Sequence, residues 1–151
     1  MDKGIYCLVF RHPACSAVVG ALGTLEFPAG FHIYIGSALG SGGLKRLERH
    51  CRLTSERNKR PKWHVDHILT DLRFELRYAV YASTEERLEC QLVDALGGDG
   101  VRNFGCSDCA CTSHFLYRRH DPREEIVAAF GMLGLLPAIK TMITQYVKGN
   151  I

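Results

Sequence analysis

The chain has 151 residues, of which 46% are apolar and 23% charged, a composition that fits one globular domain of ordinary size. Its formal net charge of +3 permits a polyanionic partner but is far below the basicity of a histone-like protein, so any nucleic-acid site must be local. No apolar run reaches the roughly 18 residues of a transmembrane helix, and Met1-Asp2-Lys3 leads into a strand-like segment instead of a signal peptide, so we expect a cytoplasmic protein.

Three strand-like runs occupy the first part of the chain. Residues 4–10 form a β-rich apolar run, residues 17–27 form a second run with Gly20 and Gly23 as expected bulges, and residues 31–38 form a third. The turn between the second and third runs predicts that all three form an antiparallel meander.

A glycine-rich turn at residues 40–43 leads into a helix that begins near Leu44. Four residues separate Arg46 from His50, so both side chains lie on one stripe of this helix. The basic linker at residues 57–62 comes next, and it is either a phosphate-contacting loop or a solvated connector.

The middle of the chain predicts two helices and a strand. Residues 63–72 read as a helix with Leu72 facing inward, and residues 75–81 alternate like a half-exposed strand. Residues 83–86 form a capping box, which predicts the start of a third helix that ends at Gly97-Gly98.

The last third begins with an irregular, cysteine-rich stretch at residues 101–114 and a short strand at residues 115–117. Asp121-Pro122 predicts the start of a helix that runs to about Leu135, and Pro137 separates it from a final helix to about Val147. Both helices are rich in apolar residues, so they either pack on their own domain or form a self-association or docking surface.

Glu89 is the most informative single residue. The apolar stripe of the third helix includes Leu88 and Leu92, and helical periodicity places Glu89 inside this stripe. An unpaired buried carboxylate costs several kcal/mol, so a metal ion, an arginine or a water-filled cleft must compensate. A buried Glu–Arg pair is the purely structural alternative.

Two tyrosines, Tyr6 and Tyr34, become candidates for function because of the residues that follow them in the sequence. A tyrosine on a strand usually serves packing, but Tyr34 precedes the glycine-rich turn and the stripe that carries Arg46 and His50. The ordered series resembles the GIY-YIG nuclease superfamily, which includes homing endonucleases and excision-repair incision subunits. The matching residues are Gly4-Ile5-Tyr6, Tyr34-Ile35-Gly36-Ser37, Lys45-Arg46-Leu47-Glu48-Arg49-His50 and Glu89.

Within that superfamily, the chain is most similar to a branch of archaeal and bacterial proteins that are sometimes fused to a base-excision DNA glycosylase. This likeness covers about residues 4–117 and rests on Trp63-His64-Val65-Asp66, Glu89-Cys90, Phe104-Gly105-Cys106-Ser107-Asp108-Cys109 and Ser113-His114. It implies an α/β (α+β) fold with a small, mostly antiparallel sheet flanked by helices. We therefore expect a nuclease domain at residues 1–120 and a two-helix C-terminal extension at residues 121–151, packed on the same domain.

The resemblance implies a metal-dependent endonuclease that hydrolyses phosphodiester bonds in nucleic acid, DNA rather than RNA, with a role in DNA repair. Arg46 would bind the scissile phosphate, and Glu89 would hold Mg²⁺ or Mn²⁺. Tyr6 would take the proton of the attacking water with support from Tyr34 and His50, although His50 is an alternative base. We expect substrate contacts from Gly36, Ser37, Lys45, Arg49, Lys59, Arg60 and His64.

Seven cysteines, an odd count without a secretory context, predict reduced thiols, with or without a metal cluster, and argue against a disulfide framework. Cys106, Cys109, Cys111 and His114 have the spacing C-x2-C-x-C-x2-H, which supplies four ligands for a structural Zn²⁺. Two alternatives remain for this compact loop. It is either a tightly packed turn or a functional loop that brings Ser107 and Asp108 close to Glu89.

Another class of function competes with the nuclease. The same fold could serve as a non-catalytic nucleic-acid-binding or scaffold module, although such a module would be expected to lose one of the five catalytic candidates. A zinc-stabilised interaction domain is a third possibility. For the C-terminal helices, the candidate partners are a second copy of the chain or another repair protein.

Overall fold

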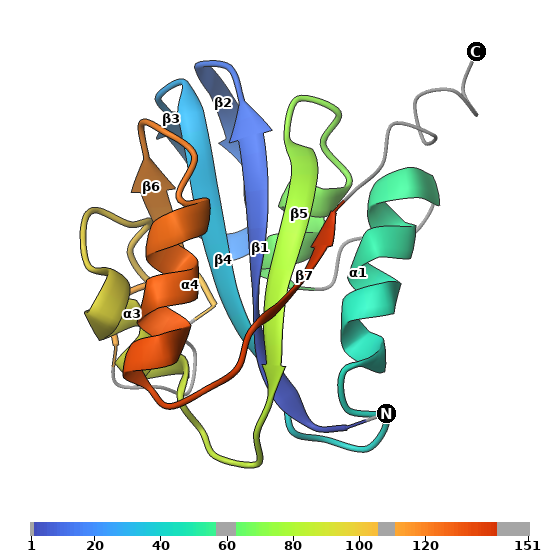
Figure 1. The fold of residues 1–151 in the computed structure, drawn as a ribbon. Helices are drawn as coiled ribbons and strands as arrows, with labels where there is room; N and C mark the ends of the chain where they lie inside the picture. The colour runs from blue at the N-terminus through green and yellow to red at the C-terminus, as the bar shows by residue number, and fades with distance from the viewer. Residues whose placement is uncertain (1, 57–62, 106–110, 142–151) are drawn as a thin grey trace.

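The computed structural model describes residues 2–56, 63–105 and 111–141 and shows an antiparallel sheet with helices on both faces (Figure 1). The sheet has five strands in the order β6-β4-β1-β5-β7. Their bounds are Phe115–Arg118, Gly30–Ala38, Gly4–His12, Glu75–Ser83 and Ala138–Thr141, respectively. The expected fold class, a mixed α/β domain with an antiparallel sheet flanked by helices, is confirmed.

The central strand β1 pairs along its length with β4 on one side and with β5 on the other. In the first ladder Tyr6 lies opposite Gly36 and Leu8 lies opposite Tyr34. Nearly every residue of β1 is buried, which is why its sequence is almost continuously apolar instead of alternating.

Alternate residues of β1 face two different helical layers. Tyr6, Leu8 and Phe10 belong to the core formed with α1 (Lys45–Glu56) and α2 (His64–Leu69). The intervening residues of β1 pack toward α3 (Glu89–Leu96) and α4 (Arg123–Met132). Each large apolar side chain buried in these layers contributes about 1.5–3 kcal/mol to folding.

The prediction of one strand over residues 17–27 is wrong. The chain instead forms β2 (Cys15–Val18), a short 3-10 helix η1 (Gly20–Leu22) and β3 (Thr24–Phe27), and the two strands pair as a separate hairpin. The glycines expected as bulges, Gly20 and Gly23, adopt φ values of 48° and 75° and allow the chain to reverse. The hairpin leaves β4 free to pair directly with β1, so the predicted meander is wrong as well.

Two helix boundaries also differ from the predictions. Helix α2 ends at Leu69 because the next residues turn around Asp71, whose carboxylate accepts hydrogen bonds from Arg73, and Leu72 is 80% exposed instead of facing inward. The predicted capping box is wrong: Thr84 accepts a hydrogen bond from the Glu86 amide in a turn, and α3 begins only at Glu89. The predicted end of α3 at Gly97 is confirmed.

One of the two helices predicted for the C-terminal part is present. The Asp121 carboxylate accepts a hydrogen bond from the Arg123 amide at 3.1 Å, and α4 begins there. The second predicted helix is wrong at residues 138–141, which form β7 and pair with β5. The edge of β5 offers backbone groups that a helix could not satisfy, so sheet pairing prevails over local pattern. Residues 142–151, the rest of that predicted helix, lie outside the described residues.

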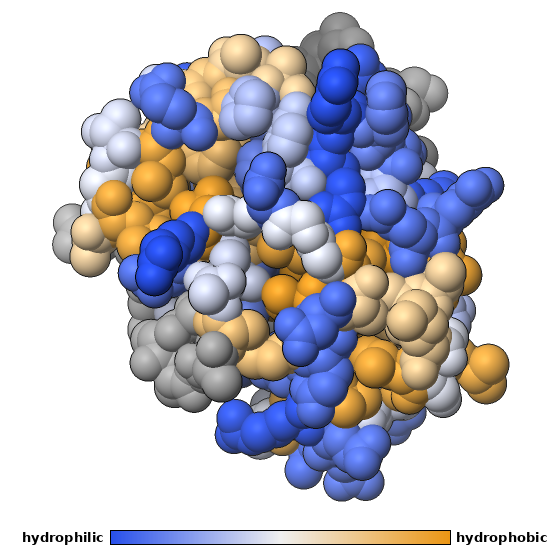
Figure 2. Space-filling model, turned by 90° about the vertical axis from the view of Figure 1, so that its left-hand side faces the viewer, coloured by the Kyte–Doolittle hydropathy of each residue, from blue (hydrophilic) through white to orange (hydrophobic). Residues whose placement is uncertain are grey.

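The surface on the side of β6 and α3 carries both hydrophilic and apolar side chains. Figure 2 shows the two kinds interspersed over this face. Within the described ranges, no helix is long and apolar enough to cross a membrane.

Two histidines lie in the core between aromatic rings. His12 and His32 are 4% and 2% exposed, and their rings are joined by a 2.8 Å hydrogen bond between His12 Nε2 and His32 Nδ1. The Pro13 carbonyl can only accept, so His12 Nδ1 carries a proton and its Nε2 accepts from His32. His32 also stacks on Phe115 with ring centroids 4.5 Å apart. Burial lowers the pKa of His12 and lowers that of His32 to about 3.

These histidines should make the fold acid-sensitive. Both are neutral when folded but protonate near their ordinary pKa when unfolded, so stability is complete above about pH 6.5 and declines as the pH falls below it. His32 alone should lower the free energy of unfolding by about 2 kcal/mol between about pH 8 and pH 5. Urea titrations across this range measure the effect.

A matched pair of variants isolates the cause. His32→Phe keeps a ring against Phe115 but cannot titrate, so its stability should depend less on pH than that of the wild type. His120→Gln, at an exposed position, should retain the full dependence. An unchanged pH dependence in His32→Phe would show that the buried ring is not the source.

Candidate active site

A cleft of about 510 Å³ opens where β4, α1, α2 and the start of α3 meet. All five predicted catalytic residues line it, namely Tyr6, Tyr34, Arg46, His50 and Glu89. Three of the predicted substrate contacts, Gly36, Ser37 and His64, line it too. Residues scattered over more than half of the chain therefore share one cavity.

Tyr6 and His50 form the buried floor of the cleft. The Tyr6 hydroxyl and His50 Nε2 are 2.9 Å apart, and both residues are at most 2% exposed. The Tyr34 ring stands near both, with its centroid 6.4 Å from each of theirs. The three rings thus hold the Tyr6 hydroxyl in a fixed position.

Glycines make this arrangement possible. A methyl group on Gly36 would lie 2.7 Å from Cζ and from the hydroxyl of Tyr6, so the tyrosine ring rests directly on the glycine backbone. A methyl group on Gly4 would collide with the carbonyl oxygen of Ala82 on the neighbouring strand. Packing therefore requires a glycine in each of the two tripeptides that sequence analysis singled out.

Arg46 occupies the rim of the cleft. Its Nη1 donates a hydrogen bond to the Ser37 carbonyl at 3.1 Å, and its guanidinium carbon lies 5.5 Å from the Trp63 ring centroid. Arg49, one turn later, lies over the same ring at 4.7 Å. Trp63 thus orients two exposed guanidinium groups of α1 through cation–π contacts.

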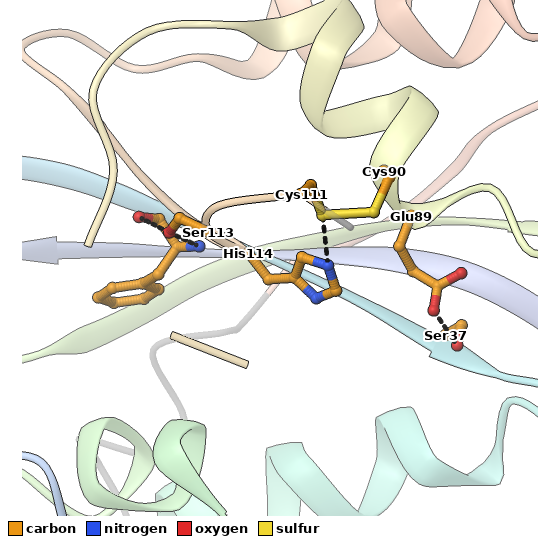
Figure 3. The surroundings of a disulfide bond; sticks show 7 residues. Ser37, Glu89, Cys90, Cys111, Ser113 and His114 are labelled. Carbon is orange, nitrogen blue, oxygen red and sulfur yellow. Dashed lines mark hydrogen bonds between the residues drawn. A yellow bond between two sulfur atoms is a disulfide. The ribbon is translucent and has the colours of Figure 1, made fainter. Parts of the chain in front are cut away.

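Glu89 reaches the cleft from the opposite helical layer. The ladder between β4 and β6 covers only Phe31 to Tyr34 of β4, so β6 does not flank the end of β4 that carries Ser37. There the Ser37 hydroxyl donates a 2.8 Å hydrogen bond to Glu89 Oε2, as Figure 3 shows. Glu89 is half-buried as the first residue of α3, and the buried Leu92 and Val93 follow three and four positions later, so it lies at the N-terminal end of the apolar stripe of that helix. An open cleft and the helix N-terminus both favour its negative charge.

His64 closes another side of the cleft. Its Nδ1 accepts a hydrogen bond from the Gly105 amide at 3.0 Å, and burial together with His67 lowers its pKa. The neutral ring then carries its proton on Nε2.

The floor of the cleft is electrically neutral. Burial, and secondarily Tyr34, raises the pKa of Tyr6 well above its ordinary value, against the opposing effect of Arg46. Burial lowers the pKa of His50 to about 4, although the Asp66 carboxylate acts in the other direction. At neutral pH, Tyr6 is a phenol and His50 is an uncharged imidazole that can accept a proton.

Other predicted residues lie elsewhere. Lys45 and Arg49 line a smaller hollow of about 200 Å³ around the glycine-rich turn, which shares Arg46 and Gly40 with the cleft. Lys59 and Arg60 lie outside the described residues. Sequence analysis missed Arg87, which lines the cleft two residues before α3. It had been counted as part of a helix that begins later than predicted.

Three cysteines, Cys7, Cys15 and Cys51, are free thiols as expected, but two others are not. Cys90 and Cys111 form a disulfide, and His114 Nε2 lies 3.1 Å from Cys111 Sγ. Of the predicted zinc ligands, Cys106 and Cys109 lie outside the described residues. Cys90 was missed because it is distant from the others in sequence.

The donor set at Glu89 suits a hard cation. Its carboxylate and the Ser37 hydroxyl offer oxygen atoms, which Mg²⁺ and Mn²⁺ prefer, and the cleft leaves space for water ligands. The residues present therefore fit the divalent metal that the resemblance implies.

Residues 5–135 match the protein family described as Domain of unknown function DUF123. The chain belongs to this family. Neither a curated protein nor a solved structure matches it. The matched range includes every residue that lines the cleft and extends through α4 to Leu135.

Substitution of Gly36 tests the packing of the site. Gly36→Ala should displace Tyr6 and lower the free energy of unfolding by about 1–3 kcal/mol, because the added methyl group overpacks the ring. Gly40→Ala is the matched control, since a methyl group there meets nothing within 4 Å. Urea denaturation of both variants measures the difference, and equal stability of the two would refute the close contact.

Proposed function

We propose that this chain is a divalent-metal-dependent endonuclease that hydrolyses phosphodiester bonds in DNA. The observation that carries the proposal is the convergence of Glu89, from one helical layer, with Tyr6 and Arg46 on a single cleft. A carboxylate that can hold a metal ion, a guanidinium and a proton-accepting pair together can catalyse phosphodiester hydrolysis.

The proton route runs through Tyr6 to His50. A phenol with a raised pKa is a poor base by itself, so Tyr6 is not present as a phenolate that could deprotonate water directly. Neutral His50 accepts the phenolic proton across the 2.9 Å contact while Tyr6 takes one from the attacking water. The pair acts as a relay in which His50 holds the proton and Tyr6 positions the nucleophile.

Arg46 supplies the positive charge. Its guanidinium is exposed at the rim, where a bidentate contact to the scissile phosphate offsets the negative charge of the transition state. Trp63 and the Ser37 carbonyl hold the side chain near the cleft before substrate arrives. This pre-organisation reduces the entropy lost on binding.

Glu89, with Ser37 as its hydrogen-bond partner, would hold one Mg²⁺ or Mn²⁺. Such an ion stabilises charge on the leaving oxygen of a phosphodiester. Ser37 fixes the carboxylate rotamer, so one oxygen of Glu89 stays directed at the cleft.

The surroundings of the cleft favour a polyanion. Lys45, Arg46 and Arg49 project from the exposed face of α1, and Arg87 lies near Glu89. Basic residues at the rim would contact phosphates on either side of the cut. The preference for DNA over RNA and a role in repair rest on the resemblance to GIY-YIG nucleases. The rival hypothesis, a non-catalytic nucleic-acid-binding module, predicts binding without cleavage.

Cleavage assays test the proposal directly. With a panel of labelled duplex, branched and base-modified DNAs, Mg²⁺ or Mn²⁺ should support cutting and EDTA should abolish it. Glu89→Gln and Arg46→Ala should each lower the rate by at least about a hundredfold. Glu124→Gln and Arg77→Ala, at exposed positions away from the cleft, are matched controls. DNA binding that persists without cleavage under all conditions would favour the non-catalytic module.

The pH profile tests the relay. His50 accepts a proton only while neutral, so the rate should fall only as the pH drops toward about 4, well below the ordinary histidine value. The measurement is kcat/KM against pH, with circular dichroism to restrict the comparison to pH values at which the protein is folded. An acidic limb near or above pH 6.5, absent in His50→Gln, would contradict a buried neutral base.

A further inference from the structure

Two cysteines and a histidine converge beside the cleft. Cys90 is the second residue of α3, whereas Cys111 and His114 belong to the segment that leads into β6. Their ligand atoms, two Sγ and one imidazole nitrogen, all lie within 4.8 Å of one another. Figure 3 shows Glu89 directed at Ser37 while the adjacent Cys90 is directed at Cys111, with His114 below the sulfur pair.

His114 is held rigidly in this position. Its amide donates to the Phe104 carbonyl at 2.9 Å, its carbonyl accepts from the Ile35 amide at 2.8 Å, and the residue is 6% exposed. These bonds fix the backbone of His114, and burial confines its side chain before any ligand binds. Its Nε2 lies 3.1 Å from Cys111 Sγ.

The three donors lie close enough together to surround one tetrahedral ion. Zinc–sulfur bonds of about 2.3 Å and zinc–nitrogen bonds of about 2.0–2.1 Å place neighbouring ligand atoms roughly 3.5–3.8 Å apart. The three ligand atoms lie within 4.8 Å of one another, with His114 Nε2 3.1 Å from Cys111 Sγ, and the Cα atoms of Cys90 and Cys111 are 5.5 Å apart. A shift of the two sulfurs away from each other is the main change that metal binding requires.

We propose that Cys90, Cys111 and His114 bind one Zn²⁺ when the disulfide is reduced. Thiolate and imidazole donors select zinc over the magnesium expected at Glu89. Water completes the tetrahedron. The set differs from the quartet expected from sequence spacing, because Cys90 comes from a different element and only the fold brings it to the site.

Oxidised and zinc-bound forms exclude each other. A phosphine reductant takes up the oxygen atom of one water molecule, cleaves the S–S bond and leaves two thiols. Each thiol then loses one proton on binding the ion, so the protein gains Zn²⁺ and releases two protons. A disulfide has no thiolate to offer, so the oxidised protein cannot bind the ion through these sulfurs.

The site would also influence the cleft. Because Glu89 precedes Cys90, zinc at Cys90 would tie the start of α3 to the segment that carries His114. This consequence rests on the proposed nuclease function, whereas the zinc site itself does not. The experiments on the zinc site therefore need no cleavage assay.

Metal content and spectroscopy test the proposal. Full-length protein treated with a phosphine reductant and Zn²⁺, then desalted, should contain one zinc per chain by elemental analysis, and untreated oxidised protein should contain none. Co²⁺ substituted for zinc should show thiolate-to-cobalt charge-transfer absorption. Zinc should also protect Cys90 and Cys111 from alkylation, as measured by mass spectrometry of the unmutated chain, which avoids any folding defect in a variant.

Variants distinguish this site from its alternatives. Cys90→Ser, Cys111→Ser and His114→Gln should each lose the ion or bind it at least tenfold more weakly. Cys15→Ser and Glu89→Gln should keep it, since neither residue supplies a ligand. Retention of zinc and of the charge-transfer band in Cys90→Ser would overturn the proposal in favour of the spacing-based quartet. Absence of zinc from the reduced wild type, or no protection of Cys90, would also overturn it.

Discussion

The register between β1 and β4 is the constraint on which the rest of the molecule depends. It sets Tyr6 opposite Gly36, and the missing side chain of Gly36 lets the tyrosine ring rest against β4 and reach His50. A slip of one residue would turn Tyr6 toward the layer of α3 and α4 and remove it from the cleft. Both faces of β1 are apolar and buried, so such a slip would cost much free energy. The packing of the core therefore fixes the position of Tyr6 in the cleft.

Neutral polar pairs are a recurring feature of this core. Tyr6 with His50 and His12 with His32 are both buried, hydrogen-bonded and uncharged near neutral pH. The same desolvation that keeps His50 uncharged at neutral pH makes the fold sensitive to acid. Arg46 and Glu89, in contrast, lie at the rim, where water can reach them.

Because the ladder between β4 and β6 is short, residues from both helical layers reach the end of β4. Because β6 ends its ladder at Tyr34, the end of β4 accepts Glu89 from α3 on one side and Arg46 from α1 on the other. The start of α3 also carries Cys90, so the disulfide lies one residue from Glu89, the proposed magnesium ligand. Hard and soft donors thus lie close together but on separate side chains.

Local pattern determined much of this protein. The apolar runs of β1, β4 and β5, the amphipathic stripe of α1 and the Gly97 stop of α3 arise from periodicity and backbone preference alone. The five catalytic candidates were also recognisable from sequence, because their order along the chain is distinctive.

Tertiary structure decided what local pattern could not. Residues 138–141 look helical by themselves but complete the open edge of β5, and Thr84 caps a turn instead of a helix. Cys90 lies 21 residues from Cys111, so their meeting depends on how α3 packs against the sheet. Such contacts join distant segments whose pairing energy exceeds local propensity, which is why the sequence by itself predicts the strands and the candidate residues but not the sheet edge or the sulfur pair.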